Sequence, residues 1–217
     1  MTLDFYHGHG SPYGWRVFLA LEAKKIPYKL NILSFSAGDT RKPEFVALNP
    51  RHVVPTIVDE GFAAWESVPV LEYLDERFPQ APKLYPGDAR GRLRIRRLIR
   101  EAEEHLDRQA IDKITDEFFG KEGAAPDLGK VESSRRKLAE ELPLFADELR
   151  GDFFGGKEIC ALDLVLYPMI GYLKRITFRK PESRLTELIP PKLAAWAARM
   201  ETLPYFDKTY PEHWRQK

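Results

Sequence analysis

The chain has 217 residues, 43% hydrophobic and 31% charged, which is the balance of a folded protein in water. A net charge of +1 gives no reason to expect nucleic acid or an anionic membrane as partner, and no apolar run approaches the roughly 20 residues that cross a bilayer. Cys160 is the only cysteine, which excludes an intrachain disulfide, and the N-terminus lacks a basic, apolar signal segment. A cytoplasmic protein is therefore expected.

The first 78 residues change between strand-like and helix-like patterns. Their order is strand, helix, strand, hairpin and helix, which is compatible with a thioredoxin-like domain. Glu60-Gly61 joins the two strands of the hairpin. The predicted elements are strands at 3–6, 28–33, 56–59 and 62–65 and helices at 15–25 and 68–78.

A proline-rich stretch then separates two parts of the chain, and the second part is helical in pattern. The sequence thus predicts an α/β plus all-α fold, with a thioredoxin-like domain at 1–78, a linker at 79–87 and an all-helical domain at 88–217. The predicted helices of the second domain cover 88–119, 126–149, 162–176 and 190–200, with a short turn near Tyr205.

A capping motif marks the start of the most apolar helix. In Ile159-Cys160-Ala161-Leu162-Asp163-Leu164, Cys160 takes the N-cap position and Asp163 the third helical position. Because a thiol is a weak hydrogen-bond acceptor, Asp163 is expected to carry most of the capping.

The stretch from Asn49 to Thr56 places a proline directly before a short strand. Proline has no N–H for a sheet ladder, and the residue before it is forced into an extended conformation. Val54 can therefore offer its backbone groups to a ligand. Glu66-Ser67 then opens a helix, where backbone amides and a hydroxyl suit a carboxylate. An extended edge beside an anion site fits a small peptide-like ligand.

In these residues the chain resembles the cytosolic glutathione S-transferases. Val-Pro before a strand, Glu-Ser at a helix start and the capping motif carry the resemblance, which covers nearly the whole chain. It implies the glutathione transferase fold, in which the first domain binds glutathione and the helical domain forms the electrophile pocket. The segment from Ser11 to Val17 resembles bacterial, serine-type members, with zeta, theta and tau classes as the nearest pattern.

The resemblance places Ser11 on the catalytic serine, which donates a hydrogen bond to the glutathione sulfur. Without the family, Ser11 would be read as a loop or N-cap residue before Pro12. Tyr6 is the rival, because other classes use a tyrosine at the end of the first strand. Its apolar strand favours a role in the core or at the rim instead.

The same resemblance assigns the other contacts with glutathione. Val54 would pair its backbone with the cysteinyl unit, with Pro55 in the cis form, and Glu66 and Ser67 would hold the γ-glutamyl end. An ordinary helix cap is the alternative for that pair. His52 would reach the glycyl carboxylate, or be an exposed loop histidine.

Three further assignments concern the surroundings of the site. Arg16 would orient the active-site loop, with a surface or structural ion pair as the alternative. Tyr13 is assigned to the electrophile pocket. His7-Gly8-His9 lacks acidic or cysteine partners nearby, so it is read as a solvated loop, and no metal is expected.

The sequence therefore predicts a glutathione S-transferase with glutathione as co-substrate. It would conjugate the glutathione thiolate to a hydrophobic electrophile, in detoxification, as a homodimer without nucleic-acid or membrane partners. Two alternatives stay open: a non-catalytic glutathione-binding or interaction protein, and a glutathione-dependent isomerase or dehalogenase on the same fold.

Overall fold

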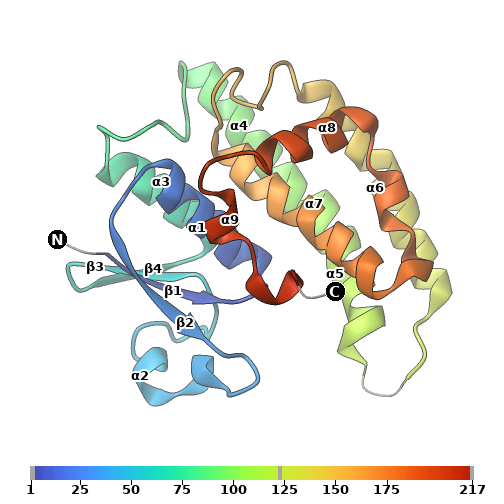
Figure 1. Cartoon of the computed structure of the whole chain (residues 1–217), viewed down its shortest axis with the longest axis horizontal. Helices are drawn as coiled ribbons and strands as arrows, with labels where there is room; N and C mark the ends of the chain where they lie inside the picture. Colours follow the sequence, from blue (N-terminus) through green and yellow to red (C-terminus); the bar gives the residue numbers. More distant parts are fainter. Residues whose placement is uncertain (1–2, 122–123, 216–217) are drawn as a thin grey trace. The chain divides into compact units, whose positions relative to one another are not determined.

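The computed structural model describes residues 3–121 and 124–215. The chain forms two compact units, of which the first combines residues 1–85 with 204–217 and the second holds residues 86–203. We describe each unit by itself, with the elements as labelled in Figure 1.

The first unit is built on a four-stranded sheet with the order β2-β1-β3-β4. β1 pairs parallel with β2, and β3 pairs antiparallel with both β1 and β4. This is the predicted thioredoxin-like sheet. The strands are β1 (Leu3–Gly8), β2 (Tyr28–Leu33), β3 (Thr56–Asp59) and β4 (Phe62–Trp65).

Two helices pack against each other over this sheet, α1 (Pro12–Ala23) and α3 (Ser67–Arg77), while α2 (Pro43–Val46) lies on the other side (Figure 1). α1 is buried on nearly all sides, because apolar residues fill its middle and end. The predicted helices at 15–25 and 68–78 are confirmed, with starts at Pro12 and Ser67.

The end of the described chain returns to the first unit. Residues 204–215, called the tail below, contain α9 (Phe206–Thr209) and the short turn η6 (Glu212–Trp214). The expected second domain at 88–217 included this stretch. The structure differs because aromatic side chains of the tail surround Trp15, which is fully buried.

The start of the predicted linker also belongs to the first unit. Asp75 on α3 accepts hydrogen bonds from the backbone N–H groups of Leu84 (2.8 Å) and Tyr85 (3.3 Å). Lys24 pairs with Asp75 at 3.0 Å and donates to the carbonyl of Pro82 at 2.9 Å. The chain after α3 is therefore fixed by a buried ion pair up to Tyr85.

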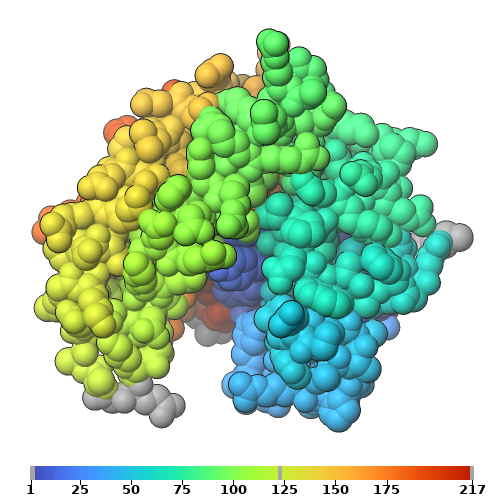
Figure 2. Space-filling model, turned by 180° about the vertical axis from the view of Figure 1, so that it is seen from behind, coloured from blue at the N-terminus to red at the C-terminus, as the bar shows by residue number. Residues whose placement is uncertain are grey.

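The second unit is helical, as predicted. The expected helix at 88–119 is one continuous helical segment from Ala89 to Gly120 that contains two stretches with π-helical hydrogen bonds. α6 (yellow in Figure 2) lies alongside this green segment. The elements of the unit are α4 (Ala89–Glu101), η2 (Ala102–Ile111), α5 (Asp112–Thr115), η3 (Asp116–Gly120), α6 (Leu128–Glu148), α7 (Ala161–Arg179), η4 (Pro181–Ser183), η5 (Leu185–Leu188) and α8 (Pro191–Met200).

α7 is the buried helix of this unit, and Asp163 fixes its start. The Asp163 carboxylate accepts from the backbone N–H of Cys160 at 2.8 Å, which confirms the expected cap. It also accepts from the backbone N–H of Phe154 (3.0 Å) and from the indole N–H of Trp196 (2.8 Å). One carboxylate thus joins the start of α7 to a loop and to α8. Within the described ranges, no helix is long and apolar enough to cross a membrane.

Candidate active site

The register of the sheet brings the predicted glutathione contacts to one end of the first unit (Figure 1). Tyr6 pairs with Thr56, and Thr56 pairs with Trp65. Because both pairings are antiparallel, the end of β1, the residues before β3 and the residues after β4 meet at the same end. These are the loop to α1, Val54-Pro55 and Glu66-Ser67.

Ser11 is the N-cap of α1, where its hydroxyl oxygen accepts a hydrogen bond of 3.1 Å from the backbone N–H of Gly14. The carbonyl of Ser11 accepts from the N–H of Trp15 at 3.0 Å. Capping uses a lone pair of the hydroxyl, so its proton can still be donated to an anion at the helix end. Ser11 is therefore an N-cap residue, and this role is compatible with a hydrogen bond from its hydroxyl to a thiolate.

His7 lies buried behind this helix start, with 1% of its surface exposed. Burial, followed by the neighbouring His9, lowers the pKa of His7 to about 3, so its ring is neutral. A Cβ at Gly14 would lie 2.3 Å from Nδ1 of His7, so the ring occupies the place of a side chain there. The reading of His7 as part of a solvated loop is wrong, whereas His9 is exposed.

Tyr6, the rival of Ser11, lies within β1 and is half-buried. Its ring packs on that of Phe45, with the ring centres 5.7 Å apart. Tyr6 therefore packs as a residue at the rim of the sheet, a role that its position in the strand favours.

Val54 and Pro55 are joined by a cis peptide bond, as the resemblance implies. Asn49 anchors this segment by donating its amide N–H groups to the carbonyl of Val53 and the hydroxyl of Thr56, both at 2.9 Å. Asn49 is fully buried and has no predicted role. Its place directly before Pro50, where asparagine favours local turns, was the available signal.

Glu66 and Ser67 form the start of α3, as predicted. Glu66 has a φ of +70°, which is uncommon for a residue other than glycine, and its side chain is exposed. Ser67 is 5% exposed, and its hydroxyl oxygen accepts a hydrogen bond from Nη1 of Arg16 at 3.1 Å. Strained backbone of this kind is concentrated at ligand sites.

Arg16 is completely buried, and Nη1 of its guanidinium group reaches from α1 to the hydroxyl of Ser67 at the start of α3. Its guanidinium group also lies over the ring of Tyr13, 4.6 Å from the ring centre. The Tyr13 ring thereby covers one face of the buried guanidinium group, while Tyr13 itself is 37% exposed.

His52 also has a positive φ, +58°, and its ring is exposed. Nδ1 lies 3.2 Å from the carbonyl oxygen of Thr40. Since a carbonyl only accepts, Nδ1 carries the proton.

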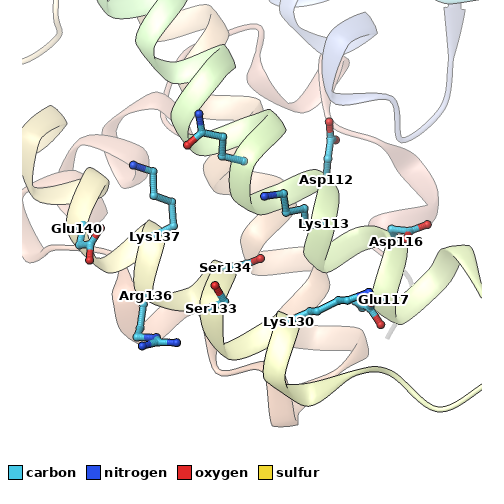
Figure 3. Close-up of a pocket in the computed structure, with 11 residues that line it drawn as sticks. Asp112, Lys113, Asp116, Glu117, Lys130, Ser133, Ser134, Arg136, Lys137 and Glu140 are labelled. Atoms are coloured by element: carbon cyan, nitrogen blue, oxygen red, sulfur yellow. The ribbon is translucent and has the colours of Figure 1, made fainter.

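A separate cavity of about 890 Å³ lies within the helical unit, between the segment η2–η3 and α6 (Figure 3). Charged side chains of both signs surround it, so it is unsuited to a hydrophobic electrophile. No predicted site residue lines it. The lining residues are Gln109, Asp112, Lys113, Asp116, Glu117, Lys130, Ser133, Ser134, Arg136, Lys137 and Glu140.

Comparison with known proteins gives consistent matches. Residues 10–77 match the family described as glutathione S-transferase, N-terminal domain. Glutathione S-transferase D7 of Drosophila melanogaster is 28% identical over 214 residues, which cover 93% of this chain and 90% of that protein.

Solved structures agree in fold. A glutathione S-transferase from the Antarctic clam Laternula elliptica has a TM-score of 0.80 at 25% identity and covers 100% of this chain and 95% of its own. Glutathione transferase Omega 3C from Trametes versicolor has a TM-score of 0.80 at 24% identity, with 98% and 90% covered.

The fold is therefore that of the glutathione S-transferases: a thioredoxin-like sheet with its helices, followed by a helical unit. The family match and the relatives support a place in the cytosolic glutathione S-transferase family. The similar proteins carry different class names, so the comparisons assign no class.

Proposed function

We propose that Ser11 activates the thiol of glutathione in a serine-type glutathione S-transferase. The family match and the relatives support glutathione transferase activity, with glutathione as the co-substrate. The observation that carries the role of Ser11 is its hydroxyl at the N-terminus of α1, held by the N–H of Gly14. The hydroxyl proton and the helix end would both stabilise a thiolate.

The required effect is moderate. A thiol with a pKa of about 8.5 is roughly 3% ionised at pH 7, and one with a pKa of about 6.5 is roughly 75% ionised. The difference corresponds to about 2.7 kcal/mol in favour of the thiolate. One hydroxyl hydrogen bond to an anion and a helix end can supply an effect of this size.

The rest of glutathione would lie along the same end of the sheet. Val54 would pair its backbone with the cysteinyl unit, and Pro55 in cis would keep that edge open. Ser67 would donate its hydroxyl proton to the γ-glutamyl carboxylate, because its oxygen already accepts from Arg16. Glu66 would bind the γ-glutamyl ammonium group. His52 would contact the glycyl carboxylate.

The bound thiolate would attack a hydrophobic electrophile, forming a carbon–sulfur bond while the leaving group or the developing anion takes the electron pair. We further propose Tyr13 as a wall of the electrophile site, a cytoplasmic location, a role in detoxification and a homodimer. Light scattering at several protein concentrations tests the last of these.

An ultraviolet difference titration of glutathione into the protein tests the role of Ser11. The set contains the wild type, Ser11→Ala, Ser11→Thr and Tyr6→Phe. We expect a thiolate band near neutral pH in the wild type, in Ser11→Thr and in Tyr6→Phe. The band is lost in Ser11→Ala, because alanine has no proton to donate.

Other results have distinct meanings. Loss of the band in Tyr6→Phe, with Ser11→Ala unchanged, would transfer the role to Tyr6. Glutathione binding without a thiolate band in any form would indicate a non-catalytic glutathione-binding protein. A thiolate band without turnover of a halogenated nitroaromatic electrophile would direct trials to isomerase and dehalogenase substrates.

A further inference from the structure

The tail contacts the residue that lies one helical turn after Ser11. Trp15 is fully buried, and its indole N–H donates to the hydroxyl oxygen of Thr209 at 3.1 Å. Thr209 is 2% exposed and donates its own proton to the carbonyl of Phe206 at 2.9 Å. The rings of Tyr210 and Trp214 meet Trp15 edge-on, with centres 5.5 and 5.6 Å away. The tail therefore fixes both the position and the orientation of Trp15.

The tail also contacts the residue directly before Ser11. Gly10 has a φ of +82°, and a Cβ there would lie 2.9 Å from Cε1 of His213 and 3.2 Å from Nε1 of Trp214. The positive φ favours glycine at this position, and an added Cβ would meet the rings of two tail residues. The ring centre of His213 also lies 6.3 Å from that of His9, which directly precedes Gly10.

Ser11 therefore lies between two points that the tail holds. On one side, His213 rests on Gly10; on the other, the N–H of Trp15 donates to the Ser11 carbonyl at 3.0 Å. A movement of either point would rotate the backbone of Ser11 and turn its hydroxyl away from the helix axis. The effect of a helix end on an anion falls off within the first turn, so a small rotation matters.

We propose that the tail is a positioning element for the thiolate site, acting through Thr209 on one side of Ser11 and through His213 on the other. This inference rests on the proposed role of Ser11. A tail that only covers Trp15 would contribute to folding and leave the ionisation of bound glutathione unchanged. A positioning tail instead changes that ionisation without contact with the electrophile.

The experiment compares full-length variants by the pKa of bound glutathione, from the thiolate band as a function of pH. Thr209→Val removes the acceptor for Trp15 at almost constant volume, and Thr209→Ser restores it. His213→Ala removes the contact with Gly10 at an exposed position, so we expect this variant to fold. Asp207→Asn is the matched control, because this exposed tail residue pairs with Arg215 of the same tail.

We expect Thr209→Val and His213→Ala each to raise the pKa of bound glutathione by about 1, a tenfold smaller ionisation constant. At a pH below the wild-type pKa of bound glutathione, kcat/KM for glutathione falls by about tenfold in these variants, while KM for the electrophile is unchanged. Thr209→Ser and Asp207→Asn keep wild-type values.

Folded Thr209→Val and His213→Ala proteins with the wild-type pKa of bound glutathione would overturn the inference and leave the role of Ser11 intact. If Thr209→Val does not fold, the result of His213→Ala decides. A wild type without a thiolate band would overturn the proposed function, and this inference with it.

Discussion

Arg16 on α1 donates a hydrogen bond of 3.1 Å to the hydroxyl oxygen of Ser67, the first residue of α3. Both side chains are buried, so the bond is protected from water. It connects the helix that Ser11 caps with the helix whose start is proposed to hold the γ-glutamyl carboxylate. Because the Ser67 oxygen accepts from Arg16, the Ser67 hydroxyl still has its proton to donate.

We predict that Arg16→Met raises KM for glutathione by about tenfold, which corresponds to about 1.4 kcal/mol, and changes KM for the electrophile little. The reason is that Ser67 loses the bond that orients its hydroxyl. Ser67→Ala should have a similar effect, and the double variant should be no worse than Ser67→Ala. Steady-state kinetics with each substrate varied in turn give the coupling. Fully additive losses would show that Arg16 does not act through Ser67.

Gly14 and Gly8 provide a matched pair for stability. At Gly14 a Cβ would meet the buried ring of His7 at 2.3 Å, and at Gly8 it would meet Cζ of Phe35 at 2.4 Å. Phe35 is 53% exposed and can swing away, whereas His7 cannot. We predict that Gly14→Ala lowers the free energy of unfolding by about 1–2 kcal/mol, because overpacking outweighs the gain in helix propensity.

Gly8→Ala should change the free energy of unfolding by at most about 0.5 kcal/mol. Urea unfolding of both variants measures the difference. In a His7→Ala background, Gly14→Ala should become neutral or stabilising. Equal losses for the two glycine variants in the wild-type background would contradict the explanation by His7.

Asp75 makes the free energy of unfolding depend on pH. Burial alone would raise its pKa, but hydrogen bonds from the Leu84 N–H and from Lys24 outweigh burial and hold the pKa of Asp75 below its ordinary value. A lowered pKa in the folded state means that Asp75 stabilises the fold above its unfolded pKa of about 3.9. This contribution is lost as the pH falls through the folded pKa.

We therefore predict that Asp75→Asn costs about 3–5 kcal/mol at pH 7, since it leaves the buried Lys24 without its carboxylate. The difference from the wild type should shrink as the pH falls below about 4 toward the lower folded pKa, because the unfolded wild type binds a proton at Asp75 before the folded protein does. Denaturant titrations from pH 7 to pH 3 measure both. A difference that stays constant over this range would contradict the assignment.

The Asp163 carboxylate accepts hydrogen bonds from three buried donors, which belong to Phe154, Cys160 and Trp196. We predict that Asp163→Ala lowers the free energy of unfolding by more than about 3 kcal/mol, because each buried donor left unsatisfied costs about 1–3 kcal/mol. Asp163→Asn keeps one acceptor oxygen and should lose less. Thermal and urea unfolding of the two variants rank them. An Asn variant as unstable as the Ala variant would mean that charge, not acceptor count, matters.

Local patterns were sufficient to predict most of the fold. Hydrophobic periodicity located the strands and helices, and the spacing of Cys160 and Asp163 identified the cap that the structure contains. These signals are readable because each depends on residues close together in the chain. The start of α3 at Ser67 belongs to the same kind of signal.

The parts that could not be predicted depend on residues far apart in the chain. Nothing near His7 indicates that its ring would fill the space beside Gly14. The partner of Arg16 lies on another helix, and the residues that surround Trp15 come from the tail. Periodicity reports which side of an element is buried, but not which distant segment buries it.

The discontinuity of the first unit has a consequence for synthesis on the ribosome. The helical unit is translated between the sheet and the tail. The side chain of Trp15 can therefore be buried by its aromatic neighbours only after that whole unit has emerged. A nascent chain held up before residue 204 would present an unfinished hydrophobic surface to chaperones and proteases. Chains that lack the tail would therefore differ from chains that carry it in the exposure of Trp15 to cellular quality control.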